Sequence, residues 1–179
     1  MSELREISVN ADIRLIEVGL NDVEAIFTTI DKERDYLQVW LPFVELTREI
    51  SFTHQFVVNY LDSDRLDLTC AVYYQNKFVG IVGLKDTDLD NEKTEIGYWL
   101  SESYQHKGII TLSCRAMIDY VFDEMDLNRI QLKAAIGNLK SQQVAKRLGF
   151  ILEGIERDGE LLLQGFVDLM VHSLLKAER

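Results

Sequence analysis

The clearest candidate for chemistry in this sequence is a seven-residue turn, Gln105-His106-Lys107-Gly108-Ile109-Ile110-Thr111. A strand-like run at residues 95–100 leads into it, and a helical pattern leaves it. A helix that begins at Gly108 leaves its first four backbone N–H groups without partners inside the helix, and its dipole adds partial positive charge there. Phosphate binds readily at such an end. The pattern predicts an anion site, although an ordinary strand-to-helix turn has the same signature.

The side chains of the turn suit the same ligand. Gly108 has no Cβ, so the backbone can approach a bound group closely. His106 and Lys107 can add hydrogen bonds or positive charge beside it. These residue types favour an anionic ligand over a purely structural turn, without excluding the latter.

Charge is unevenly distributed along the 179 residues, whose net charge is −11. Residues 1–104 hold 9 Lys and Arg against 20 Asp and Glu, whereas residues 105–147 hold 7 against 4. The negative total argues against a protein that holds nucleic acid through its phosphates. An anionic cofactor at the basic segment and a cationic substrate at the acidic remainder fit this asymmetry, and so does an uneven spread over solvated faces.

Length and composition predict a single compact domain over residues 1–179, because 47% of the residues are hydrophobic and only 1 is Pro. The first ten residues lack the apolar core of a secretory signal, and no apolar run reaches membrane-spanning length. We therefore expect a cytoplasmic protein that makes no membrane contact.

The cysteines and most histidines carry no site signature. Cys70 and Cys114 form neither a metal-ligand spacing nor a disulfide framework, so we expect two buried thiols and no metal. His54 and His172 lack partners for a catalytic triad and are interpreted as structural or solvated.

Hydrophobic periodicity outlines the first half of the chain. The expected strands lie around Ile13 and Leu15 and at 67–74, 78–85 and 93–100, with a hairpin turn at 75–77. One helix is expected after an Asn21-Asp22 cap. A second is expected at 49–61, with Phe52, Phe56, Val57 and Tyr60 on one side and an end at Asp62-Ser63-Asp64.

The second half continues with alternating helices and strands. Ile110, Cys114, Met117, Val121 and Met125 recur at helical spacing. A strand is expected at 129–136, a short helix at 139–148 that Gly149 ends, and strands at 150–157 and 167–175. A strand, a helix and a strand around Gly108 imply one parallel pair in a mostly antiparallel sheet. The expected fold is therefore mixed α/β (α+β), with helices on both faces of the sheet.

The sequence resembles the GNAT superfamily of N-acetyltransferases. The superfamily's pyrophosphate pattern, Gln/Arg-x-x-Gly-x-Gly/Ala, matches at Gln105 and Gly108, whereas Ile110 departs from the small third residue. Further motifs resemble the ribosomal-protein N-terminal (serine/alanine) acetyltransferase subgroup. They are Trp40-Leu41-Pro42-Phe43, Glu95-Ile96-Gly97-Tyr98-Trp99-Leu100, Asn138-x-x-Ser141, Leu148-Gly149-Phe150-x-x-Glu153-Gly154 and the tail around Asp168.

The resemblance implies that acetyl-CoA binds where two parallel strands splay apart. The backbone near Trp99 and Leu100 would pair with the pantetheine arm, and an N–H near Leu100 would stabilise the oxyanion by about 3 kcal/mol. The pyrophosphate would be held by the amides of the turn, namely Gln105, His106, Lys107, Gly108, Ile109, Ile110 and Thr111.

Two polar residues follow the expected strand at 129–136. By resemblance, Asn138 contacts the pantetheine and the Ser141 hydroxyl donates a proton to the departing CoA thiolate. The alternative is that Asn138 is only a helix N-cap and Ser141 a first-turn polar residue. Many GNAT enzymes use a Tyr for this proton, but Tyr104 and Tyr120 do not lie at the matching position.

Glu160, which follows an expected turn at Asp158-Gly159, is the candidate general base by its family position, and Glu95 is the second candidate. Either could instead be a solvated surface carboxylate. Direct attack needs a neutral amine, and the α-amino pKa of about 8 lies below the value of about 10.4 for Lys. This difference favours a chain N-terminus over Lys by about 3 kcal/mol at neutral pH.

Two apolar segments, Trp40 to Phe43 and Leu161-Leu162-Leu163, fall in expected loops. They could border a binding groove or pack on the first helices. The leading hypothesis is a transferase that moves acetyl from acetyl-CoA to the N-terminal α-amine of a protein, plausibly ribosomal, through a ternary complex. The alternatives are acetylation of a polyamine or aminoglycoside and a non-catalytic acyl-CoA sensor, and relatives suggest a possible homodimer.

Overall fold

A computed structural model describes residues 4–62 and 66–179. Within these residues the strands form one sheet in the order β1-β2-β3-β4-β5-β6-β8-β7. The strands are β1 (Glu6–Ser8), β2 (Ile13–Glu17), β3 (Thr69–Tyr74), β4 (Lys77–Asp88), β5 (Lys93–Leu100), β6 (Arg129–Ala135), β7 (Ile151–Leu162) and β8 (Gly165–Leu175).

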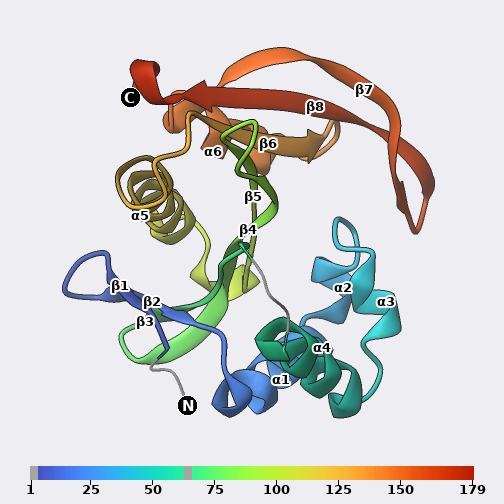
Figure 1. Cartoon of the computed structure of the whole chain (residues 1–179). Helices are drawn as coiled ribbons and strands as arrows, with labels where there is room; N and C mark the ends of the chain where they lie inside the picture. The colour runs from blue at the N-terminus through green and yellow to red at the C-terminus, as the bar shows by residue number, and fades with distance from the viewer. Residues whose placement is uncertain (1–3, 63–65) are drawn as a thin grey trace.

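Helices cover both faces of this sheet (Figure 1). They are α1 (Val23–Lys32), α2 (Arg34–Leu37), α3 (Phe43–Leu46), α4 (Ile50–Asp62), α5 (Ile109–Asp123) and α6 (Leu139–Arg147). Helices α5 and α6 pack on one face, and α1 and α4 pack on the other. The expected α/β fold is therefore confirmed.

Among the strands of the described residues, only β5 and β6 are parallel neighbours, and α5 connects the two. Their pairing is short: it joins Lys93 to Arg129, Thr94 to Ile130 and Glu95 to Gln131. Both strands run on beyond this point, to Leu100 and to Ala135. The sheet therefore contains a fork that opens after Glu95, as the sequence predicted for a splayed parallel pair.

Gly80 of β4 permits an unusually close approach at the open end of the fork. A Cβ added there would lie 2.2 Å from the carbonyl oxygen of Trp99 and 3.0 Å from the Cα of Leu100. Both are backbone atoms, so no side-chain rotation could relieve the contact. Glycine at position 80 is thus a requirement for the path of β5 at the open end of the fork.

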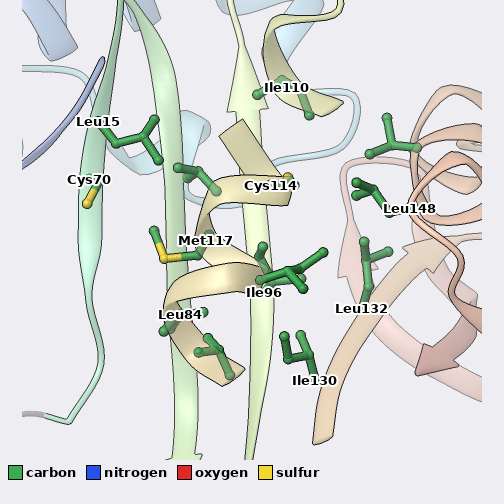
Figure 2. Close-up of a cluster of buried hydrophobic side chains, with 14 of the residues drawn as sticks. Leu15, Cys70, Leu84, Ile96, Ile110, Cys114, Met117, Ile130, Leu132 and Leu148 are labelled. Atoms are coloured by element: carbon green, nitrogen blue, oxygen red, sulfur yellow. The ribbon is translucent and has the colours of Figure 1, made fainter. Parts of the chain in front are cut away.

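The main core lies between α5, α6 and the sheet (Figure 2). In Figure 2, Met117 and Cys114 of α5 lie over the strands that carry Leu84 and Ile96, while Leu132 approaches from β6. Cys70 and Cys114 are free and buried, as expected, and burial raises the pKa of Cys70 to about 12. A second core under α1 and α4 includes Trp99.

Several predictions of local structure were wrong. Phe52 and Phe56 are exposed, because α4 buries the stripe Thr53, Val57 and Tyr60 instead. Asp22 is the N-cap residue of α1 as expected, but its carboxylate accepts the N–H of Gly19 at 2.8 Å and makes no capping hydrogen bond to α1. Strand β1 and the short helices α2 and α3 were missed, because segments of 3 or 4 residues show no periodicity.

The largest error concerns the β7–β8 hairpin. The sequence predicted strands at 150–157 and 167–175, but β7 extends to Leu162 and β8 begins at Gly165. The Asp158-Gly159 pair is not a turn: it lies in a register shift between Glu156 and Glu160, where Asp158 has a φ of 49°. A β-bulge uses the same residue types as a turn, which explains the error. The expected end of α4 at residues 62–64 falls partly outside the described residues.

No helix in the described part of the chain is long and apolar enough to cross a membrane.

Candidate active site

The turn at residues 105–111, here called the phosphate turn after the ligand that the sequence predicts, leads directly into α5 as expected. Gly108 precedes α5 with a φ of 74°, a left-handed conformation that costs other residues about 1–2 kcal/mol. No atom lies within 4 Å of the position where its Cβ would stand, so conformation rather than space requires glycine here. Ile109 and Ile110 are 1% and 8% exposed, because their side chains pack in the core. These two residues can therefore offer a ligand only their backbone.

Two cations lie near the start of α5. Lys107 places its Nζ 5.4 Å from the ring centre of Tyr74 and 5.1 Å from that of Tyr104. Arg147, at the end of α6, donates from Nη1 to Thr111 Oγ1 at 3.0 Å. Because Thr111 is in the first turn of α5, this contact brings a guanidinium to the helix N-terminus that the sequence pattern marked.

The side chain of Gln105 connects two helices. Its Oε1 accepts from Lys140 Nζ of α6 at 2.8 Å, and its Nε2 donates to the hydroxyl of Tyr36 in α2. The Gln105 side chain is therefore engaged with the protein, and only its backbone is available to a ligand. His106 is exposed and has a φ of 60°.

At the other side of the fork, Asn138 caps α6. Its Oδ1 accepts the N–H of Ser141 at 3.2 Å, so the interpretation of Asn138 as an N-cap is confirmed. Tyr98 of β5 donates its hydroxyl to the Ser141 carbonyl at 3.4 Å, and burial raises the pKa of Tyr98, which keeps it protonated. The Ser141 hydroxyl makes no hydrogen bond to any residue that the structure describes, so it is free to serve a ligand.

Glu95, at the last pair of the fork, is 7% exposed and surrounded by donors. Lys85 Nζ lies 2.8 Å from its Oε1, while Gln131 Nε2 and Lys133 Nζ lie 3.1 Å and 3.9 Å from its Oε2. Burial acts to lower the pKa of Lys85, but the hydrogen bond and charge of Glu95 outweigh it and leave that pKa raised. Glu95 is therefore a bound carboxylate rather than a solvated one.

Glu160 lies in the same cluster but is unpaired. It is half-buried in β7 opposite Val167, and its carboxylate makes no hydrogen bond or ion pair with the residues described. Burial raises its pKa, the charge of Lys85 opposes the rise, and the charge of Glu95 adds to it. Both sequence candidates for a base thus share one electrostatic environment, in which Glu160 is the carboxylate without a direct cation.

An open cavity of about 410 Å³ lies beyond the end of β6. Trp40 and Gly137 both line the cavity and pack closely, because a Cβ on Gly137 would lie 3.1 Å from Trp40 Cη2. Asn138 directly follows Gly137, so the cavity adjoins the α6 cap. The remaining lining residues are Ala135, Ile136, Gln164, Phe166, Val167 and Asp168.

The sequence left open whether the two apolar segments border a groove or pack on the first helices, and each alternative holds for part of them. Trp40 lines the cavity and packs with Leu162, whereas Leu41 packs on the core beneath the first helices. Leu161 and Leu163 are exposed beside the cavity wall, at 58% and 51%. Their placement in a loop was wrong for Leu161 and Leu162, which end β7.

The family model for the acetyltransferase (GNAT) domain matches residues 12–151. The chain belongs to the GNAT family. It is an acetyl-CoA-dependent N-acetyltransferase, and its fold and cosubstrate agree with those that the sequence predicted.

Three relatives illustrate the similarity. The putative ribosomal N-acetyltransferase YdaF of Bacillus subtilis is 34% identical over 97% of this chain and 95% of its own. RimL, a ribosomal L7/L12 alpha-N-protein acetyltransferase solved with coenzyme A, is 25% identical, with a TM-score of 0.91 over 96% of this chain and 98% of its own. The microcin C7 self-immunity acetyltransferase MccE, solved with acetyl-CoA and AMP, is 27% identical, with a TM-score of 0.89 over 93% and 94%.

Sequence reasoning missed several contacts around the turn at residues 105–111 and around Glu95. Arg147, Lys140 and Tyr36 reach the phosphate turn from other helices, and Lys85 and Lys133 reach Glu95 from neighbouring strands. The excess of positive charge in residues 105–147 was a signal for Arg147, Lys140 and Lys133, whereas Tyr36 and Lys85 lie outside that segment. Among the described residues, no group of His, Cys, Asp and Glu has the arrangement of a metal site.

Proposed function

We propose that this GNAT enzyme acetylates the N-terminal α-amine of a protein, and that the acceptor is a ribosomal protein. The cavity beside the α6 cap carries the proposal. It opens to solvent, its lining is mostly apolar, and Asp168 is its one carboxylate. An open, weakly charged cavity suits the first residues of a peptide, whereas a polyamine needs several carboxylates in a closed pocket. The names of YdaF and RimL support the same acceptor class.

Acetyl-CoA would lie in the fork between β5 and β6. The amides of residues 105–111, with Gly108 at the start of α5, would hold the pyrophosphate. Lys107 and Arg147 would add charge around it. The backbone of Trp99 and Leu100, which extends past the last pair with β6, would bind the pantetheine from one side of the fork, with Asn138 on the other.

The acceptor would enter through the cavity as an ammonium and lose its proton to Glu160 directly or through water. The neutral nitrogen then attacks the thioester carbonyl, and a backbone N–H near Leu100 stabilises the oxyanion. A C–N bond forms first, and the C–S bond breaks as the oxyanion collapses. The Ser141 hydroxyl donates its proton to the departing thiolate and regains a proton from the second N–H of the attacking nitrogen, directly or through water. The raised pKa of Glu160 makes it a stronger base than an ordinary carboxylate.

A small amine is the second candidate, because MccE resembles this chain over nearly its whole length. The carboxylates Glu95, Glu156 and Glu160 could attract a small cation. Lys85 and Lys133 already pair with the first two, at 2.8 Å and 2.7 Å, which leaves one free carboxylate. That number favours a single ammonium over a polyamine.

The test is CoA-thiol release from acetyl-CoA with three kinds of acceptor. Peptides that begin with Ser, Ala or Met are compared with N-terminally blocked Lys peptides and with polyamines, and products are identified by mass. The proposal predicts release with the free-N-terminus peptides only. Release with polyamines alone would refute it in favour of the small-amine candidate. A ribosomal acceptor also implies a cytoplasmic enzyme.

A further inference from the structure

Five charged side chains converge where the fork closes. They are Lys85 of β4, Glu95 of β5, Lys133 of β6, and Glu156 and Glu160 of β7. Two ion pairs account for four of them, since Lys85 lies 2.8 Å from Glu95 and Lys133 lies 2.7 Å from Glu156. The group holds one more carboxylate than it holds cations, and Glu160 is the unpaired member.

Which carboxylate stays unpaired depends on the carboxylate with which Lys85 pairs. Its ammonium interacts electrostatically with both Glu95 and Glu160, but its hydrogen bond is to Glu95. The Lys85 side chain is 59% exposed and has a flexible four-carbon stem, so it is not fixed by packing. Glu95 is fixed, because it is buried and also contacts Gln131 and Lys133. Glu95 therefore determines where the ammonium of Lys85 rests.

An ion pair between Lys85 and Glu160 would disable the site described above. A carboxylate that binds a lysine cannot also receive the ammonium of an acceptor, and the lysine lowers its strength as a base. The other charged groups nearby have their own partners. Lys133 contacts Glu156 and Glu95, Asp168 of β8 accepts the N–H of Asp158, and Asp86 acts on Lys85 rather than on Glu160. Lys85 is thus the cation that must not pair with Glu160 if the site is to work.

Resting on the proposed function, we propose that Glu95 is a positioning residue: it holds Lys85 away from Glu160 and leaves Glu160 free to bind and deprotonate the acceptor amine. Glu95 acts through Lys85 and need not touch the substrate. This assigns different tasks to the two carboxylates that the sequence offered as alternative bases. Only Glu160 exchanges a proton with the acceptor.

The proposal predicts rescue of one variant by a second substitution. In Glu95→Gln, Lys85 loses its anionic partner and turns to Glu160, so kcat/KM falls by about tenfold or more. The acidic limb of the pH profile of kcat/KM also moves to lower pH in this variant, because a paired carboxylate has a lower pKa. Adding Lys85→Met removes the competing ammonium, and kcat/KM returns to within about threefold of the wild type. Adding Lys133→Met instead gives no rescue, because Lys133 pairs with Glu156.

Lys85→Met alone supplies a test that does not need a stable Glu95 variant. It removes the charge that opposes the raised pKa of Glu160, so the acid limb of kcat/KM moves to higher pH while the plateau is kept. Circular dichroism melts establish that each protein is folded. Equal impairment of Glu95→Gln with and without Lys85→Met, or an unchanged acid limb in Lys85→Met, would overturn the proposal.

The assay also separates this inference from the function on which it rests. The variants are assayed with whichever acceptor the wild type acetylates. Wild-type activity on amines other than peptide N-termini, or full activity in Glu160→Gln, refutes the proposed function. Loss of activity in Glu160→Gln without the rescue of Glu95→Gln leaves that function standing and refutes only the role of Glu95.

Discussion

The proposed site has a cofactor side and an acceptor side, and the two are built in different ways. The proposed cofactor side is a backbone site: Gly108 sets a φ of 74° at the start of α5, and the next two side chains are buried in the core. The proposed acceptor side is a side-chain site, in which Glu95 contacts Lys85 and Lys133 while Glu160 has no direct cation.

This difference has a physical basis. Pyrophosphate is the same in every turnover, and the N–H groups at a helix N-terminus bind it with little help from side chains. The acceptor must be recognised and also lose a proton, which requires groups that titrate and so depend on burial and nearby charge. Substitutions should therefore have large effects on the acceptor side and small effects on the cofactor side.

Glu160→Gln should have the largest effect. Removing a general base costs about 10²–10⁴ in kcat/KM for the peptide, while the affinity for acetyl-CoA stays unchanged. Steady-state kinetics and calorimetric titration of acetyl-CoA measure the two quantities. Glu156→Gln is the matched control on the same strand. It frees Lys133, which keeps Glu95 as a partner, so kcat/KM should change little. Equal losses in both variants would argue for general electrostatics rather than a base.

Ser141→Ala should rank second, with kcat lower by about 10² and little change in KM for acetyl-CoA. Its hydroxyl makes no hydrogen bond within the described structure, so α6 should keep its cap from Asn138 and its stability. The comparison is Tyr98→Phe, which removes the other hydroxyl near this turn. A larger loss of kcat in Tyr98→Phe would transfer the role of proton donor to Tyr98.

Gly80→Ala tests the geometry of the fork itself. The added Cβ would meet the carbonyl oxygen of Trp99 at 2.2 Å, so the end of β5 must move. Overpacking of this kind costs about 1–3 kcal/mol in the free energy of unfolding, which urea denaturation measures. Gly154→Ala is the control within β7, since no atom lies within 4 Å of its Cβ position. Similar losses at both positions would mean that the contact at Gly80 is not restrictive.

Arg147→Ala should have the smallest effect of the four. Its guanidinium is exposed, so its loss should raise KM for acetyl-CoA by about fivefold and leave kcat unchanged. Rising salt should shrink the difference from the wild type, because exposed charges are screened. Lys146→Ala removes a neighbouring exposed cation with no recorded contact to the turn. A loss of kcat in Arg147→Ala would contradict the division between the two sides.

The two sides also differed in how far the sequence predicted them. The bounds of β5 and the start of α5 were predicted closely, because a strand pattern, Gly108 and a helical repeat follow one another directly in the chain. The hairpin that carries Glu160 was predicted poorly, because Asp158-Gly159 has the composition of a turn but forms a bulge. Lys85 and Arg147 could not be assigned, since their partners lie 10 and 36 residues away and are set by strand register and helix packing.

Tertiary contact also decided which candidate carboxylate stayed free. The sequence offered Glu160 as the candidate base by its family position and Glu95 as the second candidate, but neither residue type nor spacing distinguishes them. Only the pairing of β4 with β5 brings Lys85 opposite Glu95. Local sequence therefore identified the members of the proposed site, and the sheet determined their partners.

The most direct test of the central claim is a competition within one molecule. A peptide with a free N-terminal Ser and one internal Lys is incubated with the enzyme and acetyl-CoA, and fragment mass spectra locate the acetyl group. The account predicts acetylation of the α-amine, with the Lys side chain unmodified. Acetylation of the Lys, or of neither amine while a polyamine in the same reaction is modified, would contradict it.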